Sequence, residues 1–152
     1  MTAAEKPLNG IDGRNRANML DGWGKAFLLI GAGSVLNALW MLVGPETWYE
    51  HLPAAVPDFG PFNVHFVRDI GCAYLTIGLA LAWAGRNHTL RFPLVTVAAV
   101  FFVAHSLLHV FDTARGHVDA VHWLLDFPAI HLPAIFLLFA ARRFAPGQRA
   151  SS

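Results

Sequence analysis

Residues 92–112 read FPLVTVAAVFFVAHSLLHVFD, an apolar run whose final third carries two histidines four residues apart. An apolar stretch of about 20 residues is long enough to cross a bilayer as a helix. On such a helix His105 and His109 lie on one face, with Asp112 one turn further along. Because an unpaired imidazole is costly among apolar side chains, this stretch predicts partners for both histidines elsewhere in the chain.

The composition of the 152-residue chain indicates a membrane protein. Hydrophobic residues make up 55% of it and charged residues 14%, with a mean hydropathy of +0.45. Soluble domains carry about 25% charged residues. A formal net charge of +1 offers no basic surface for nucleic acid. The single cysteine, Cys72, excludes an intrachain disulfide and any cysteine-rich zinc or iron–sulfur site.

Four apolar segments separated by polar links predict an all-α integral membrane four-helix bundle over residues 23–143. Residues 1–22 and 144–152 are expected to be polar tails. The link at 46–61 is rich in proline and is expected to be an irregular loop with interfacial aromatics. The expected spans are about 24–43, 63–84, 92–112 and 120–141.

Basic residues predict how the bundle is oriented. With four spans, both tails and the link between the second and third spans share one side of the membrane. That side holds nine of the 11 Lys and Arg residues, and only Arg68 and Arg115 fall on the other. By the positive-inside rule, both termini are expected to be cytoplasmic. The nine are Lys6, Arg14, Arg16, Lys25, Arg86, Arg91, Arg142, Arg143 and Arg149.

Spans two, three and four each carry a pair of ionisable residues near the end expected to lie outside. The members of each pair are four residues apart in sequence, hence about 6 Å apart along a helix axis. The topology therefore predicts an outer and an inner layer at matching depths. The outer layer contains His65, His109 and His122, and the inner layer contains Asp69, His105 and Asp126.

Span two carries a longer polar stripe. His65, Asp69, Cys72 and Thr76 follow the i, i+4, i+7, i+11 spacing of one helix face. Polar groups in membrane helices normally face the bundle interior, so this stripe is expected to face inward and help enclose a polar pocket. His131 falls roughly 180° from His122 on an ideal helix, and the two prolines of that segment leave its direction open.

Imidazole and carboxylate groups are ligands that Zn, Fe, Mn and Cu(II) accept. We therefore predict that one or two transition-metal ions bind near the extracytoplasmic face, in a membrane oxidoreductase or hydrolase. The first alternative is a b-type haem held by two histidines. The second is a non-catalytic subunit of a membrane complex that handles metal or protons. Simple helix-to-helix hydrogen bonding is the structural alternative. The predicted metal ligands are His65, Asp69, His105, His109, His122 and Asp126.

Residues 63–79 read NVHFVRDIGCAYLTIGL and follow a proline-rich loop. The Arg-Asp-x-Gly…Gly-Leu pattern in a four-span chain of this size resembles small DoxX-like bacterial membrane proteins. The resemblance implies a four-helix bundle in the bacterial inner membrane. Some of these families are linked to sulfur or quinone redox chemistry, but the resemblance assigns neither an activity nor the histidine pairs. The expected partners are the lipid bilayer and other membrane subunits or further copies of the chain.

Overall fold

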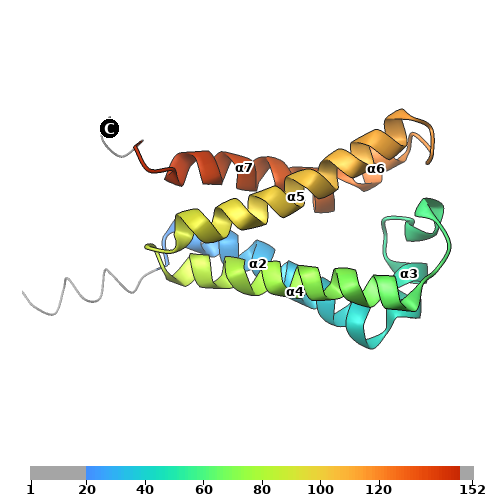
Figure 1. The fold of residues 1–152 in the computed structure, drawn as a ribbon, viewed down its shortest axis with the longest axis horizontal. Coiled ribbons are helices and arrows are strands. Elements are labelled where there is room, and N and C mark those ends of the chain that lie inside the picture. Colours follow the sequence, from blue (N-terminus) through green and yellow to red (C-terminus); the bar gives the residue numbers. More distant parts are fainter. Residues whose placement is uncertain (1–19, 148–152) are drawn as a thin grey trace, which may run out of the picture.

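The computed structural model describes residues 20–147, and every regular element within them is helical (Figure 1). The all-α prediction is confirmed, as are four helices long and apolar enough to cross a membrane. Large apolar side chains are exposed on all four, which suits a lipid bilayer. Most of both predicted tails lies outside the described residues. The four candidate spans are α2 (Gly22–Val43), α4 (Val64–Arg86), α5 (Arg91–Ala114) and Phe127–Phe144.

Glycines spaced seven residues apart bring α2 and α4 into close antiparallel contact. A Cβ added to Gly24 would lie 2.6 Å from the carbonyl oxygen of Gly85. One added to Gly31 would lie 2.8 Å from the carbonyl oxygen of Gly78. Further along, Gly71 of α4 approaches α2 in the same way. Small residues let two membrane helices pack backbone against backbone, so this pair has extensive van der Waals contact.

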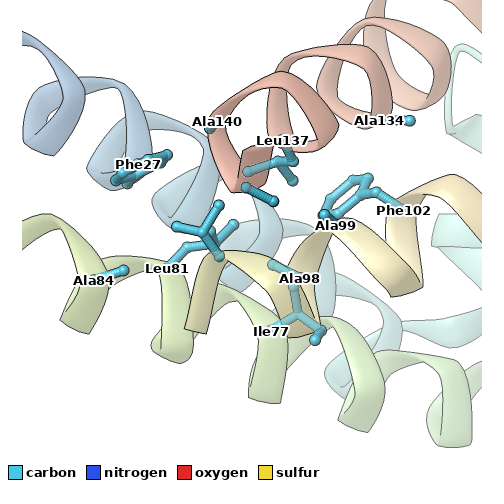
Figure 2. Close-up of a cluster of buried hydrophobic side chains, with 12 residues drawn as sticks. Phe27, Ile77, Leu81, Ala84, Ala98, Ala99, Phe102, Ala134, Leu137 and Ala140 are labelled. Carbon is cyan, nitrogen blue, oxygen red and sulfur yellow. The ribbon is translucent and has the colours of Figure 1, made fainter. Parts of the chain in front are cut away.

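A cluster of buried apolar side chains joins the α2–α4 pair to α5 and α7 (Leu132–Phe144) (Figure 2). Leu81 and Leu137 are fully buried within it, and Phe102 is almost so. All four spans contribute, so the cluster fixes their mutual arrangement. Its largest members are Phe27, Ile77, Leu81, Phe102 and Leu137.

An ion pair closes the end of the bundle where α2 begins. Asp21 caps α2 by accepting a hydrogen bond from the backbone N–H of Gly24 at 2.7 Å. The same carboxylate receives two hydrogen bonds from the buried guanidinium of Arg91, at 2.8 and 2.9 Å. Arg91 also lies over the rings of Phe27 and Phe144. These hydrogen bonds lower the pKa of Asp21 from its ordinary value of 3.8.

The fourth apolar segment is broken where one continuous helix over 120–141 was expected. It consists of α6 (His122–Leu125), the π-helical turn η2 (Phe127–His131) and α7. In the π turn the backbone N–H of His131 donates to the carbonyl of Asp126, five residues earlier, at 3.2 Å. A π turn takes more residues than an α turn and so shifts the faces of the helix that follows.

The link between the first two long helices contains two short helices where an irregular loop was expected. They are α3 (Pro45–His51) and the 3-10 turn η1 (Val56–Phe59). Proline at the first position favours the start of α3, because its missing N–H would have no helical partner there. The Tyr49 hydroxyl donates to the carbonyl of Gly60 at 2.7 Å and so secures the loop that contains η1.

Candidate functional site

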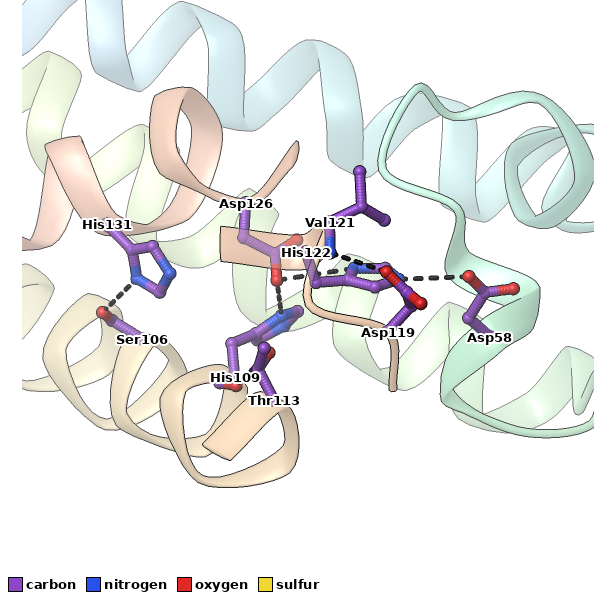
Figure 3. Close-up of polar contacts among 9 residues, drawn as sticks. All are labelled: Asp58, Ser106, His109, Thr113, Asp119, Val121, His122, Asp126 and His131. Atoms are coloured by element: carbon purple, nitrogen blue, oxygen red, sulfur yellow. Dashed lines mark hydrogen bonds and ion pairs between the residues drawn. The ribbon is translucent and has the colours of Figure 1, made fainter. Parts of the chain in front are cut away.

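Asp126 is the centre of a buried polar cluster between α5 and the fourth apolar segment (Figure 3). Its Oδ2 lies 2.8 Å from Nδ1 of His109 and 3.7 Å from Nδ1 of His122. The side chains of His122 and Asp126 are 0% and 1% exposed. A carboxylate at this position accepts a hydrogen bond from a neutral imidazole and pairs with a protonated one. One oxygen of Asp126, Oδ2, therefore lies close to both imidazoles.

Asp58 of η1 extends the cluster to the surface of the bundle. Its Oδ2 lies 3.1 Å from Nε2 of His122, although the two residues are 64 apart in sequence. The Asp58 side chain is 51% exposed, whereas that of His122 is fully buried. The contacts form a chain in the order Asp58, His122, Asp126, His109. We call this chain of four side chains the outer relay.

Phe59 lies between the two imidazoles of the outer relay. Its ring centroid is 4.6 Å from that of His109 and 4.7 Å from that of His122. An apolar ring at this position keeps water from the imidazoles, and a low local dielectric strengthens the contacts they make with Asp126.

Two further histidines lie deeper in the same region. The His105 ring is 4.7 Å from that of His109, one turn along α5, and packs edge-on against Tyr74. Nδ1 of His131 lies 2.7 Å from the hydroxyl oxygen of Ser106 (Figure 3). The π turn therefore turns His131 toward α5, a direction that an ideal helix does not give it.

Span two does not contribute to this cluster, and the predicted inward-facing stripe is wrong. His65 and Asp69 pair with each other at 3.4 Å with side chains 86% and 59% exposed, and Cys72 and Thr76 are exposed as well. The glycine face of α4 packs against α2 instead, and Gly78 lies about 140° around the helix from His65. Close backbone packing decides which face turns inward. The three-helix, two-layer arrangement is therefore also wrong.

Of the six predicted ligands, the structure brings together His105, His109, His122 and Asp126, and leaves the other two on the far face of α4. Sequence reasoning did not include Asp58 and Phe59 among them. Their contacts arise from a loop folding back over residues about 50 to 64 positions later, for which the sequence carries no local signal.

Within residues 20–147, no group of three or more His, Cys, Asp and Glu side chains is arranged to hold a metal ion. At 2.8 Å, His109 and Asp126 are hydrogen-bonded to each other. Two buried atoms of the cluster nevertheless have no hydrogen-bond partner, namely Nδ1 of His122 and Oδ1 of Asp126. The 3.7 Å separation from His122 to Asp126 is too long for a hydrogen bond but short enough for electrostatic attraction.

No family model, curated protein or solved structure matches the chain. The resemblance to DoxX-like membrane proteins therefore stays a prediction, as does bis-histidine haem ligation.

Proposed function

We propose that this protein passes protons between the extracytoplasmic surface and buried histidines in the outer half of a membrane bundle, as a proton-handling component of a bacterial inner-membrane complex. The observation that supports this proposal is the outer relay. It begins at a half-exposed carboxylate, Asp58, and reaches the largely buried His109 through side chains that are 0% and 1% exposed.

The distribution of basic residues supports the proposed sidedness. Lys25, Arg86, Arg91, Arg142 and Arg143 lie where α2 and α5 begin and where α4 and α7 end. The Asp21–Arg91 pair ties these helix ends together at one end of the bundle. The outer relay lies toward the opposite end. The positive-inside rule therefore supports a relay on the extracytoplasmic side.

The relay has the chemistry that proton transfer needs. An imidazole accepts a proton on one nitrogen and releases one from the other at near-neutral pH. In this chain His122 takes up a proton on Nε2 beside Asp58 and releases one from Nδ1 toward Asp126. The protonated Asp126 then delivers its proton to Nδ1 of His109, in the tautomer of His109 that has its own proton on Nε2. The 3.7 Å step is the longest, so a small movement of the His122 ring is required there.

The relay ends inside the bundle. Beyond His109 the next imidazole is that of His105, which contacts its neighbours ring to ring, and the following turn of α5 enters the apolar cluster at Phe102. Apolar side chains offer no proton acceptor. The proposed function is therefore proton exchange with one side of the membrane, without conduction across it.

The test is the sidedness of proton access. Proteoliposomes with one orientation receive a pH jump on either side, and infrared spectroscopy follows the carboxyl band that Asp126→Asn removes. We expect a fast response to a jump on the side of the outer relay and none, on that timescale, to a jump on the other side. Equal responses from both sides would contradict the proposal.

Transition-metal binding is the second candidate function. The unpartnered Nδ1 of His122 and Oδ1 of Asp126 support it, because both are donor atoms that Zn, Fe, Mn and Cu accept. When bound, such an ion would supply Lewis-acid or redox chemistry. Elemental analysis of protein purified without chelators tests this candidate. Stoichiometric metal that disappears in His122→Ala supports it, whereas metal-free, folded protein contradicts it.

A further inference from the structure

We infer that the face of α4 that carries His65 and Asp69 is an interface with a second copy of this chain. This face continues through four more exposed side chains toward the other end of the helix, with alternating spacings of four and three residues. That alternation is the a/d pattern by which two helices pack along a common seam. The seam consists of His65, Asp69, Cys72, Thr76, Leu79 and Trp83.

No element of the described chain covers this seam. Gly78, which contacts α2, lies about 140° around the helix from His65. Tyr74, which packs against Phe101 of α5, lies about 180° from it. The seam therefore points away from both neighbours of α4, and in a monomer it would face lipid.

The polar half of the seam does not suit lipid. Asp69 lies about 6 Å further into the span than His65. Ionisable side chains in membrane helices nearly always face other protein or a water-filled cavity, because hydrocarbon does not solvate them. The pairing of His65 with Asp69 at 3.4 Å leaves both side chains largely exposed. A partner surface with its own polar groups removes this cost.

A second copy fits because the seam is complementary to itself. A two-fold axis along the membrane normal brings the His65–Asp69 pairs of the two copies into one cluster, in which each imidazole can donate to a carboxylate of its own or of the other copy. The Nε of Arg68 donates to the carbonyl of Leu42 on α2, which draws this side chain toward α2. Thr76 brings no unsatisfied hydroxyl, because it donates to the carbonyl of Cys72 at 2.9 Å.

The small side chains of Cys72 and Thr76 at the middle of the seam permit close approach of two helices. In a parallel pair, equivalent residues meet near the axis. Cys72 then lies opposite Cys72 of the second copy, at a separation suited to a disulfide. This is a measurable consequence, since Cys72 is the single cysteine of the chain.

The test is oxidation of membranes that contain the full chain with copper phenanthroline, followed by non-reducing electrophoresis. We expect the 16.6 kDa chain to shift to twice that mass and to return on reduction. The matched control is Cys72→Ala with Val100→Cys, which moves the thiol to a position on α5 that is 66% exposed. We expect little cross-linking of the control. Absence of the wild-type dimer, or equal cross-linking of wild type and control, would overturn the inference.

A second measurement makes the result independent of cysteine chemistry. Light scattering of protein in nanodiscs gives the number of copies. Asp69→Leu is expected to raise the dissociation constant of the dimer about tenfold, which corresponds to ~1.4 kcal/mol of association free energy. A monomeric wild type overturns the inference, and so does a dimer in which Asp69→Leu has no effect. Neither outcome bears on the outer relay, which lies on other elements.

Discussion

The two ends of the bundle each contain a polar cluster that joins distant elements, and they differ in how fully its groups are paired. At the end where α2 begins, Arg91 donates two hydrogen bonds to Asp21 and a third to the carbonyl of Ala84 at 3.3 Å. At the other end, the buried cluster of His122 and Asp126 leaves two polar atoms without partners. Fully paired clusters hold helices together, whereas spare donor and acceptor capacity allows a group to take up a proton or an ion.

The largest stability loss is expected at the fully paired end. Arg91→Ala removes the ion pair and the contacts with Phe27 and Phe144. We expect a loss of about 3 kcal/mol in the free energy of unfolding. This value is at the lower end of the range for breaking a buried ion pair, because Asp21 is partly exposed. Unfolding in mixed micelles measures it. A loss smaller than that of Asp126→Ala would reverse the comparison of the two ends.

At the relay end, Asp126→Ala is expected to cost about 1–3 kcal/mol, because Nδ1 of the largely buried His109 then lacks its hydrogen-bond partner. Asp126→Asn keeps an accepting oxygen, so its cost is expected to stay below about 1 kcal/mol. Neither alanine nor the amide passes a proton on, so the infrared band of the His109 imidazole is expected to stop responding to an external pH jump in both variants. If His109 still responded in Asp126→Asn, Asp126 would not belong to the proton path.

Acid is expected to weaken the fully paired end. Because Arg91 lowers the pKa of Asp21, the folded state binds this carboxylate's proton less readily than the unfolded chain does. The stabilisation is complete above the ordinary value of 3.8 and is lost as pH falls through the lowered pKa of the folded state. Unfolding as a function of pH measures this loss. In Asp21→Asn this contribution is absent, so a wild-type curve parallel to that of the variant would contradict the prediction.

The smallest effect on the relay is expected from the exposed face of α4. His65→Ala changes a side chain that is distant from the cluster and largely exposed, so the response to external pH is expected to stay at the wild-type level. His122→Ala removes the relay member between Asp58 and Asp126 and is expected to abolish the response of the Asp126 carboxyl to external pH. The infrared measurement applies to both. Equal losses in the two variants would show that span two takes part after all.

The number of apolar segments and the lengths of the first three helices are predictable from the sequence, because hydropathy over about 20 residues reflects the thickness of a bilayer directly. Part of the cluster is predictable for a similar reason, since the four-residue spacing of His122 and Asp126 places both on one helix face. The position of His131 is not predictable from the sequence, because a π turn has no clear sequence pattern and changes the direction of the residues that follow it.

The orientation of α4 shows why polar patterning alone is insufficient. Two stripes compete on this helix, one polar from His65 and one of glycines from Gly71. The polar stripe predicts burial, yet close packing of glycines against α2 places it outside. In lipid, van der Waals contact between backbones decides the packing, and an exposed polar stripe then indicates a partner beyond the chain.

The most direct test of the outer relay is the rate at which the Asp126 carboxyl band responds to an external pH jump when Asp58 is changed. Asp58→Asn removes the acidic surface end of the relay, and Asp112→Asn is the matched control because Asp112 contacts His117 outside the relay. The relay predicts a slower response in Asp58→Asn and a wild-type rate in Asp112→Asn. Equal rates in both variants and the wild type would contradict it.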